Sequence, residues 1–179
     1  YIGTRGGGLN IIDKKTKGTQ IITTRNGLSN NAVLAINKDH QGNYWIGLDG
    51  EGIDMIEAKS QRILHFPRDF ENSNPLTFGA VYAICIDVFG NVWLGTSGYG
   101  IIRLTVSKSA NGKYLLKEYD QINSTDTPEL LSMKSNIVYS ILEEKPNVMW
   151  FGTRGGGIYR YNSLAKKIEE TYQSGSSKD

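Results

Sequence analysis

Apolar residues recur along the chain in short runs of four to six positions, separated by turns rich in glycine, asparagine and aspartate. Four runs make one cycle, and the clearest cycle has its runs at 33–37, 44–48, 53–56 and 62–66. Runs of this length between polar turns predict β-strands, and no segment shows a sustained helical period of 3.6 residues. One cycle therefore predicts a meander of four short antiparallel strands, which we label A to D.

The cycle is built around one aromatic and glycine-rich phrase that occurs four times. Its copies are Tyr1–Gly8, Trp45–Gly52, Trp93–Gly100 and Trp150–Gly157. Their first residues lie 44 to 57 positions apart, and repeats of about this length are typical of β-propeller blades.

The strand pattern divides the chain into five segments. They are a partial repeat at 1–31, complete repeats at 32–79, 80–136 and 137–173, and a polar tail at 174–179. The first repeat lacks strand A, and the last repeat ends after strand D. The predicted fold class is therefore all-β: a β-propeller fragment of four-stranded antiparallel blades, with three complete blades plus three strands of a fourth. Residues 128–134 are expected to form at most one short helical turn.

Each complete repeat has an acidic residue six positions before its tryptophan. In the second and third repeats it is Asp39 and Asp87, and an aspartate at the start of a tight turn accepts hydrogen bonds from backbone amides two residues on. Glu144 takes this position in the fourth repeat, and we expect a looser turn there.

The tryptophan and the glycine two positions after it are expected to be structural. The residues are Trp45, Trp93 and Trp150, with Gly47, Gly95 and Gly152. A large flat ring on strand B can fill the gap between neighbouring sheets. The glycine shares the face of the ring, and the absence of a side chain there allows close approach.

Composition excludes few classes of protein. Lys plus Arg total 20 against 18 Asp plus Glu, a net charge of +2 without a basic cluster, so no nucleic-acid partner is expected. The single Cys85 excludes an intrachain disulfide and lies in an apolar run, which suggests a small buried side chain. No apolar stretch approaches about 20 residues, so any membrane contact is expected only through segments outside this chain.

No catalytic, metal or cofactor site is predicted. The two histidines, His40 and His65, fall in a turn and an outer strand on different parts of a blade, and neither has a companion at metal-ligand spacing. The adjacent acids at 143–144 and 169–170 alternate sides of a strand or turn, so they are expected to be solvated rather than a catalytic pair.

A ligand site is expected on one face of the propeller. In an up-and-down blade, the B–C turns and the D-to-A loops lie on the same face, and binding residues are often carried on loops of a rigid scaffold. The ligand-binding residues expected on these turns are Arg5, Asp49, Glu51, Tyr99 and Arg154. Their chemistry suits a sugar, with charged groups for hydroxyls and a ring face for C–H groups. The alternative is that each of them is merely solvated or shapes its turn.

The repeat resembles a known family. The stretch Gly27–Ile36, followed by Asp39, Gly42–Gly47 and Gly50–Ile53, is similar to the two-component regulator propeller repeat, and the resemblance covers essentially the whole chain in four copies. It implies a periplasmic sensor region of a Bacteroidetes hybrid two-component system that detects oligosaccharides or glycan breakdown products. In that family a β-sandwich, a membrane helix, a histidine kinase and a DNA-binding regulator follow, and this chain contains none of them.

Three functions remain open from the sequence. The first is a non-catalytic sensor module, with an oligosaccharide ligand and a homodimeric full receptor. The second is a propeller enzyme acting on polysaccharide, such as a lyase or glycosidase. The third is a structural or protein-binding propeller. Because the chain begins in the middle of a repeat, we also expect either that a longer parent supplies further blades or that two copies associate into an eight-bladed ring.

Overall fold

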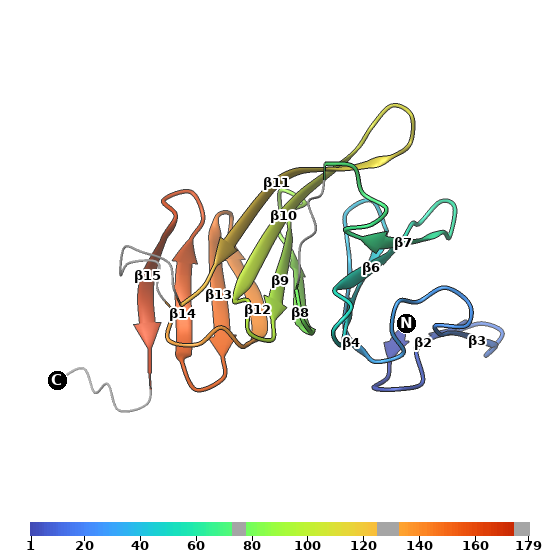
Figure 1. The fold of residues 1–179 in the computed structure, drawn as a ribbon, viewed down its shortest axis with the longest axis horizontal. Helices are drawn as coiled ribbons and strands as arrows, with labels where there is room; N and C mark the ends of the chain where they lie inside the picture. Colours follow the sequence, from blue (N-terminus) through green and yellow to red (C-terminus); the bar gives the residue numbers. More distant parts are fainter. Residues whose placement is uncertain (73–77, 125–132, 174–179) are drawn as a thin grey trace.

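The structure is a computed structural model that describes residues 1–72, 78–124 and 133–173. All regular structure in these residues is β-strand, arranged as four separate antiparallel sheets in an arc (Figure 1). The helical turn expected at 128–134 falls mainly on residues outside this description, as does the tail at 174–179.

The four sheets are consecutive blades. Blade 1 has three strands, β1 (Ile2–Gly3), β2 (Leu9–Ile12) and β3 (Thr19–Ile22). Blade 2 contains β4 (Val33–Lys38), β5 (Tyr44–Leu48), β6 (Ile53–Ile56) and β7 (Ile63–Phe66). Blade 3 contains β8 (Val81–Ile86), β9 (Val92–Thr96), β10 (Ile101–Lys108) and β11 (Tyr114–Ile122). Blade 4 contains β12 (Val138–Lys145), β13 (Val148–Thr153), β14 (Gly157–Asn162) and β15 (Lys167–Tyr172).

Every sheet follows chain order, so each blade is an up-and-down meander. The predicted fold class, with three complete blades plus three strands of a fourth, is confirmed. Figure 1 shows blades 1 and 4 at opposite ends of the arc.

Apolar cores lie between blades rather than within them. One cluster joins Leu9 and Ile22 of blade 1 to Ile46 of blade 2. A second cluster fills the gap between blades 2 and 3, and a third fills the gap between blades 3 and 4. Each blade is therefore stabilised mainly by its neighbours, as in other repeat proteins.

The aromatic–glycine phrase lies at these blade junctions. The rings of Trp45 and Trp93 are 2% and 1% exposed, and the ring of Trp93 lies 6.0 Å from that of Phe151 in the next blade. A Cβ on Gly95 would lie 2.9 Å from the carbonyl oxygen of Val138, too close for a real side chain. The glycine therefore lets strand A of the next blade approach the sheet.

An Asx turn holds each buried tryptophan in place. Asp39 accepts hydrogen bonds from the backbone amides of Gln41 and Asn43, and its other oxygen accepts the Trp45 indole N–H at 3.0 Å. The same bonds recur from Asp87, which accepts the Trp93 indole N–H at 2.9 Å. Turn geometry and blade packing are therefore set by one side chain.

The prediction of a looser turn before Trp150 is wrong. Lys145 pairs directly with Val148, so only two residues join β12 and β13, and Asn147 takes the left-handed conformation at φ 67° that such a tight hairpin needs. Glu144, one methylene longer than aspartate, reaches from the extended strand to accept the Trp150 indole N–H at 2.8 Å.

Both end blades leave one face uncovered. On blade 4, Leu142 and Ile158 are 64% and 49% exposed, although the residue matching Ile158 in blade 3, Ile101, is completely buried. On blade 1, the exposed apolar residues are Ile2, Ile12 and Ile21. These two end faces carry side chains of the kind that form the cores between blades elsewhere.

Candidate functional site

The five residues expected to bind a ligand all lie at exposed positions in B–C turns. The backbone oxygens of Asp49 and Tyr99 accept amide hydrogen bonds from Asn30 and Gln121, at 2.7 and 2.8 Å. These bonds attach the turns to the ends of the D-to-A loops on the same face.

The structure places Arg5, Asp49, Glu51, Tyr99 and Arg154 on four different blades and brings no two of them into hydrogen-bonding or ion-pair contact. The charged side chains of this set make no hydrogen bond or ion pair with another described residue. They are therefore available to a ligand, and their role as binding residues stays a prediction.

A buried polar cluster lies where the D-to-A loop that joins blades 1 and 2 packs onto strands β6 and β7 of blade 2. Asp54 is completely buried and accepts hydrogen bonds from the backbone amide and the hydroxyl of Ser29, both at 2.8 Å. The Nδ1 atom of His65 lies 2.8 Å from Asp54 and 2.6 Å from the Ser29 hydroxyl. The sequence interpretation placed His65 on an outer strand and missed this contact. The signal that could have found it is a carboxylate at position 54 in an otherwise apolar run.

This Ser–His–Asp combination is not a nucleophile relay. In a relay, the serine and the aspartate contact different nitrogens of the imidazole, so that the base can remove the hydroxyl proton. Here both groups meet the same Nδ1 atom of His65. The cluster therefore anchors the loop at Ser29 to blade 2.

The opposite face of the propeller, formed by the A–B and C–D turns, has a feature that the sequence interpretation did not predict. Strands β10 and β11 are longer than the corresponding strands of the other blades, and their hairpin reaches over blade 2 (Figure 1). The backbone N–H of Glu71 donates to the backbone carbonyl oxygen of Tyr114 at 2.9 Å, and the backbone carbonyl oxygen of Glu71 accepts the Leu116 N–H at 2.9 Å. The hairpin of blade 3 is therefore pinned to the segment that follows β7 in blade 2.

The carboxylate of Glu57, in the C–D turn of blade 2, forms a second link to the hairpin. We call this link and the two backbone bonds at Glu71 the hairpin clamp. The buried Glu57 carboxylate accepts hydrogen bonds from Lys108 and Ser60, and from the Tyr114 hydroxyl at 3.1 Å. The bond from Lys108, more than any other contact, lowers the pKa of Glu57 to about 2. Burial of the Tyr114 hydroxyl has the larger effect on its pKa, and its hydrogen bond to the Glu57 carboxylate adds to it. Together they raise the pKa of Tyr114 to about 12.

The clamp should make stability depend on pH at the acid end. A lowered carboxyl pKa contributes stability that is fully present above about pH 4.5 and is lost as the pH falls towards 2. We expect the Tm of Glu57→Gln to lie below that of the wild type at pH 7, and the gap to narrow across this window. Thermal unfolding followed by circular dichroism measures it. A Tm difference between wild type and Glu57→Gln that stays constant from pH 7 to pH 2 would contradict this prediction. So would an equally large Tm difference for the exposed control Glu51→Gln.

Two hollows open on either side of the Glu57 and Tyr114 pair. One has a volume of about 430 Å³ and lies between the turns of blades 2 and 3. The other, of about 400 Å³, lies beneath the hairpin and is lined by Arg62, Arg68 and Lys113 among others. Both are on the face opposite the B–C turns.

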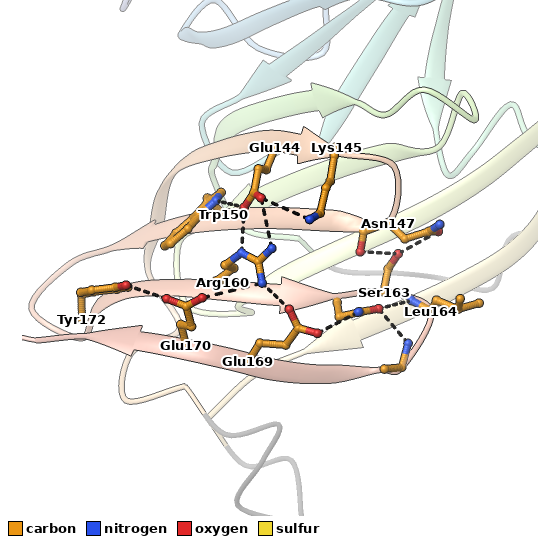
Figure 2. A network of polar contacts seen from close by, with 12 residues as sticks. Glu144, Lys145, Asn147, Trp150, Arg160, Ser163, Leu164, Glu169, Glu170 and Tyr172 are labelled. Carbon is orange, nitrogen blue, oxygen red and sulfur yellow. Dashed lines mark hydrogen bonds and ion pairs between the residues drawn. The ribbon is translucent and has the colours of Figure 1, made fainter.

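The uncovered face of blade 4 carries an ionic network (Figure 2). Arg160 donates from Nε to Glu144 at 2.7 Å and also pairs with Glu169. Its guanidinium lies 6.0 Å from the centre of the Trp150 ring. The Arg160 contact lowers the pKa of Glu144 to about 2. The guanidinium of Arg160 therefore lies over the Trp150 ring on the face of blade 4 that no further blade covers.

Comparison with known families identifies the repeat. The model of the two-component regulator propeller matches residues 27–50, 75–98 and 132–155. Each match contains the Asx-turn or hairpin region, strand B and the B–C turn described above. Three of the four repeats therefore match the two-component regulator propeller repeat.

Solved structures resemble the whole arc of regulator propeller blades. The extracellular domain of a protein named as a one-component system from B. thetaiotaomicron aligns over 96% of this chain with a TM-score of 0.63 and 21% identity. The extracellular domain of one named as a hybrid two-component system from the same organism aligns over 98% with a TM-score of 0.52 and 17% identity. YCF48 from Cyanidioschyzon merolae aligns over 96% with a TM-score of 0.56 and 13% identity. At these identities the likeness shows a shared fold.

The chain spans only part of those structures: 21% and 27% of the two bacterial domains and 58% of YCF48. No curated protein sequence matches the chain. Within residues 1–72, 78–124 and 133–173, no helix is long and apolar enough to cross a membrane, and no group of three metal-binding side chains is present.

Proposed function

We propose that these regulator propeller blades are a non-catalytic, ligand-sensing part of an extracytoplasmic receptor of the two-component type, with the periplasm as its compartment. The single observation that carries this proposal is the match of the two-component regulator propeller model to three of the four repeats. The likeness to extracellular domains of two bacterial signalling proteins supports it.

We place the ligand on the face of the B–C turns. The scaffold residues of the repeat recur from blade to blade, whereas the turn residues differ: Arg5 and Arg154 stand where blade 2 has Asp49 and blade 3 has Ser97. Exposed charged groups without partners, held by a rigid scaffold, suit a polar ligand. An oligosaccharide or a glycan breakdown product fits these donors and acceptors, and Tyr99 offers it a ring face. A homodimer of the full receptor would carry the signal onward.

Isothermal titration calorimetry of the complete ectodomain against a broad panel of glycan fragments tests this function. We expect one fragment to bind, and the double variant Arg5→Ala/Arg154→Ala to weaken its affinity at least tenfold. The control Lys14→Ala, an exposed cation outside the B–C turns, should leave affinity unchanged. If no fragment of the panel binds, the structural or protein-binding propeller is favoured. If a fragment is cleaved, the polysaccharide enzyme is favoured.

A further inference from the structure

The hollow of about 430 Å³ between blades 2 and 3 is a separate feature from the B–C face. Blade 2 contributes its A–B and C–D turns, and blade 3 contributes the turn at Phe89 and the base of the long hairpin. Its volume falls within the range of small-molecule sites, which commonly lie at junctions between structural units. The junction exists in this form because the β10–β11 hairpin is pinned across to blade 2.

The apolar floor of the hollow is rigid. Trp45 and Val92 line it and are almost completely buried. The indole of Trp45 is fixed by its bond to Asp39, and the Tyr114 ring on the wall is fixed by its bond to Glu57. A ligand would therefore meet a surface that needs little ordering, which favours binding.

The two carboxylates that line the hollow already have hydrogen-bond or ion-pair partners within the protein. Asp39 accepts four hydrogen bonds from the turn and from Trp45, and Glu57 is bound by Lys108, Ser60 and Tyr114. The acids therefore offer little to a cationic ligand.

The groups without partners are of a different kind. The side chains of Lys59, Gln41 and Ser107 line the hollow and make no hydrogen bond or ion pair with another described residue. Phe89 also lines the hollow, and 62% of its surface is exposed, so its ring is accessible to a ligand. The available chemistry is one cation, two polar groups and one aromatic face.

We propose that this hollow binds a carboxylate carried on a six-membered ring. The ring lies over Val92 with its face against Phe89, the carboxylate pairs with Lys59, and Gln41 or Ser107 bonds to a further polar atom. A sugar acid and an aromatic acid share this chemistry. The site differs from the proposed B–C face in location, in residues and in the requirement for a negative charge.

Saturation-transfer NMR on the full chain, with glucuronate, benzoate and glucose as probes, tests the proposal. We expect at least one of the two acids to bind, and glucose to bind at least tenfold more weakly than glucuronate. Binding of glucuronate alone identifies a sugar acid, binding of benzoate alone identifies an aromatic acid, and both results support the site. Failure of both acids, or equal binding of glucose and glucuronate, overturns it.

Variants locate the binding in this hollow. Lys59→Gln and Phe89→Ala should each weaken acid binding about tenfold, and both residues are exposed, so folding should persist. The matched controls are Lys14→Gln, an exposed lysine on blade 1, and Val88→Ala, an exposed apolar residue beside Phe89. Acid binding that both test variants leave intact contradicts the proposed site. Since Arg5→Ala/Arg154→Ala should not change acid binding, failure here is distinguishable from failure of the proposed function.

Discussion

Replacing Trp93 by alanine is expected to lower the free energy of unfolding by about 3–5 kcal/mol, the range found for large aromatic residues in a core. The ring is 1% exposed and contacts Phe151 and Tyr161 of blade 4, and its N–H is bound by Asp87. Removing it leaves a cavity between two blades and takes one of two hydrogen bonds from a buried oxygen of the Asp87 carboxylate. Urea unfolding of the wild type and the variant measures the change.

The repeat supplies a matched control. Trp150 occupies the same place on blade 4 but is only half-buried, so Trp150→Ala should cost about 1 kcal/mol. Trp93→Phe, which keeps most of the apolar surface and loses the N–H, should fall between the two and gives a measurement if Trp93→Ala does not fold. Equal effects of Trp93→Ala and Trp150→Ala would show that burial between blades is not what the tryptophan contributes.

The isolated chain is expected to self-associate through its two end faces. The face of blade 4 exposes Leu142 and Ile158, and the face of blade 1 exposes Ile2, Ile12 and Ile21, all at positions that neighbouring blades cover elsewhere. Exposed apolar sheet faces of this kind favour association. Sedimentation velocity should therefore show dimers or larger species, and Ile158→Lys or Ile21→Lys should shift the population towards the monomer.

Val88→Asp is the control for this experiment, because Val88 is equally exposed but lies in an A–B turn away from both faces. It should leave the sedimentation profile unchanged. A wild-type chain that stays monomeric at high concentration contradicts association of two copies. In that case we propose that further blades of a longer parent are the natural occupants of both faces.

The fold follows from the sequence because its determinants are local and repeated. Runs of strand residues, the aspartate of the A–B turn and the glycine three positions after it (Gly42 and Gly90, both at positive φ) act within a few residues of one another, and each signal occurs in more than one copy. The turn at Glu144 failed as a prediction because the change is cooperative: lengthening β12 and β13 creates a tight hairpin, and only a longer acid still reaches Trp150.

The candidate sites were less predictable because they depend on contacts between distant segments. The sequence shows that 107–113 is a polar turn, but not that the hairpin pairs with Glu71, some 40 positions away. Likewise, Asp54 and His65 face each other across two strands of blade 2, but Ser29 joins them only when the loop between blades 1 and 2 packs onto that sheet. Exposed residues of the B–C turns were placed correctly on their turns by periodicity alone, and nothing local indicates which of them a ligand touches.

The hairpin that crosses from blade 3 to blade 2 also bears on how such a chain can change during evolution. In repeat proteins each unit contacts only its neighbours, so the contacts at one junction decide which units can be exchanged separately. Here backbone hydrogen bonds at Glu71 and the Glu57–Lys108 pair tie two particular blades together. A duplication or exchange that separated them would leave the hairpin without its partner and would dismantle both hollows. We therefore expect that exchange of blade 2 or blade 3 alone would cost more stability than exchange of the two together.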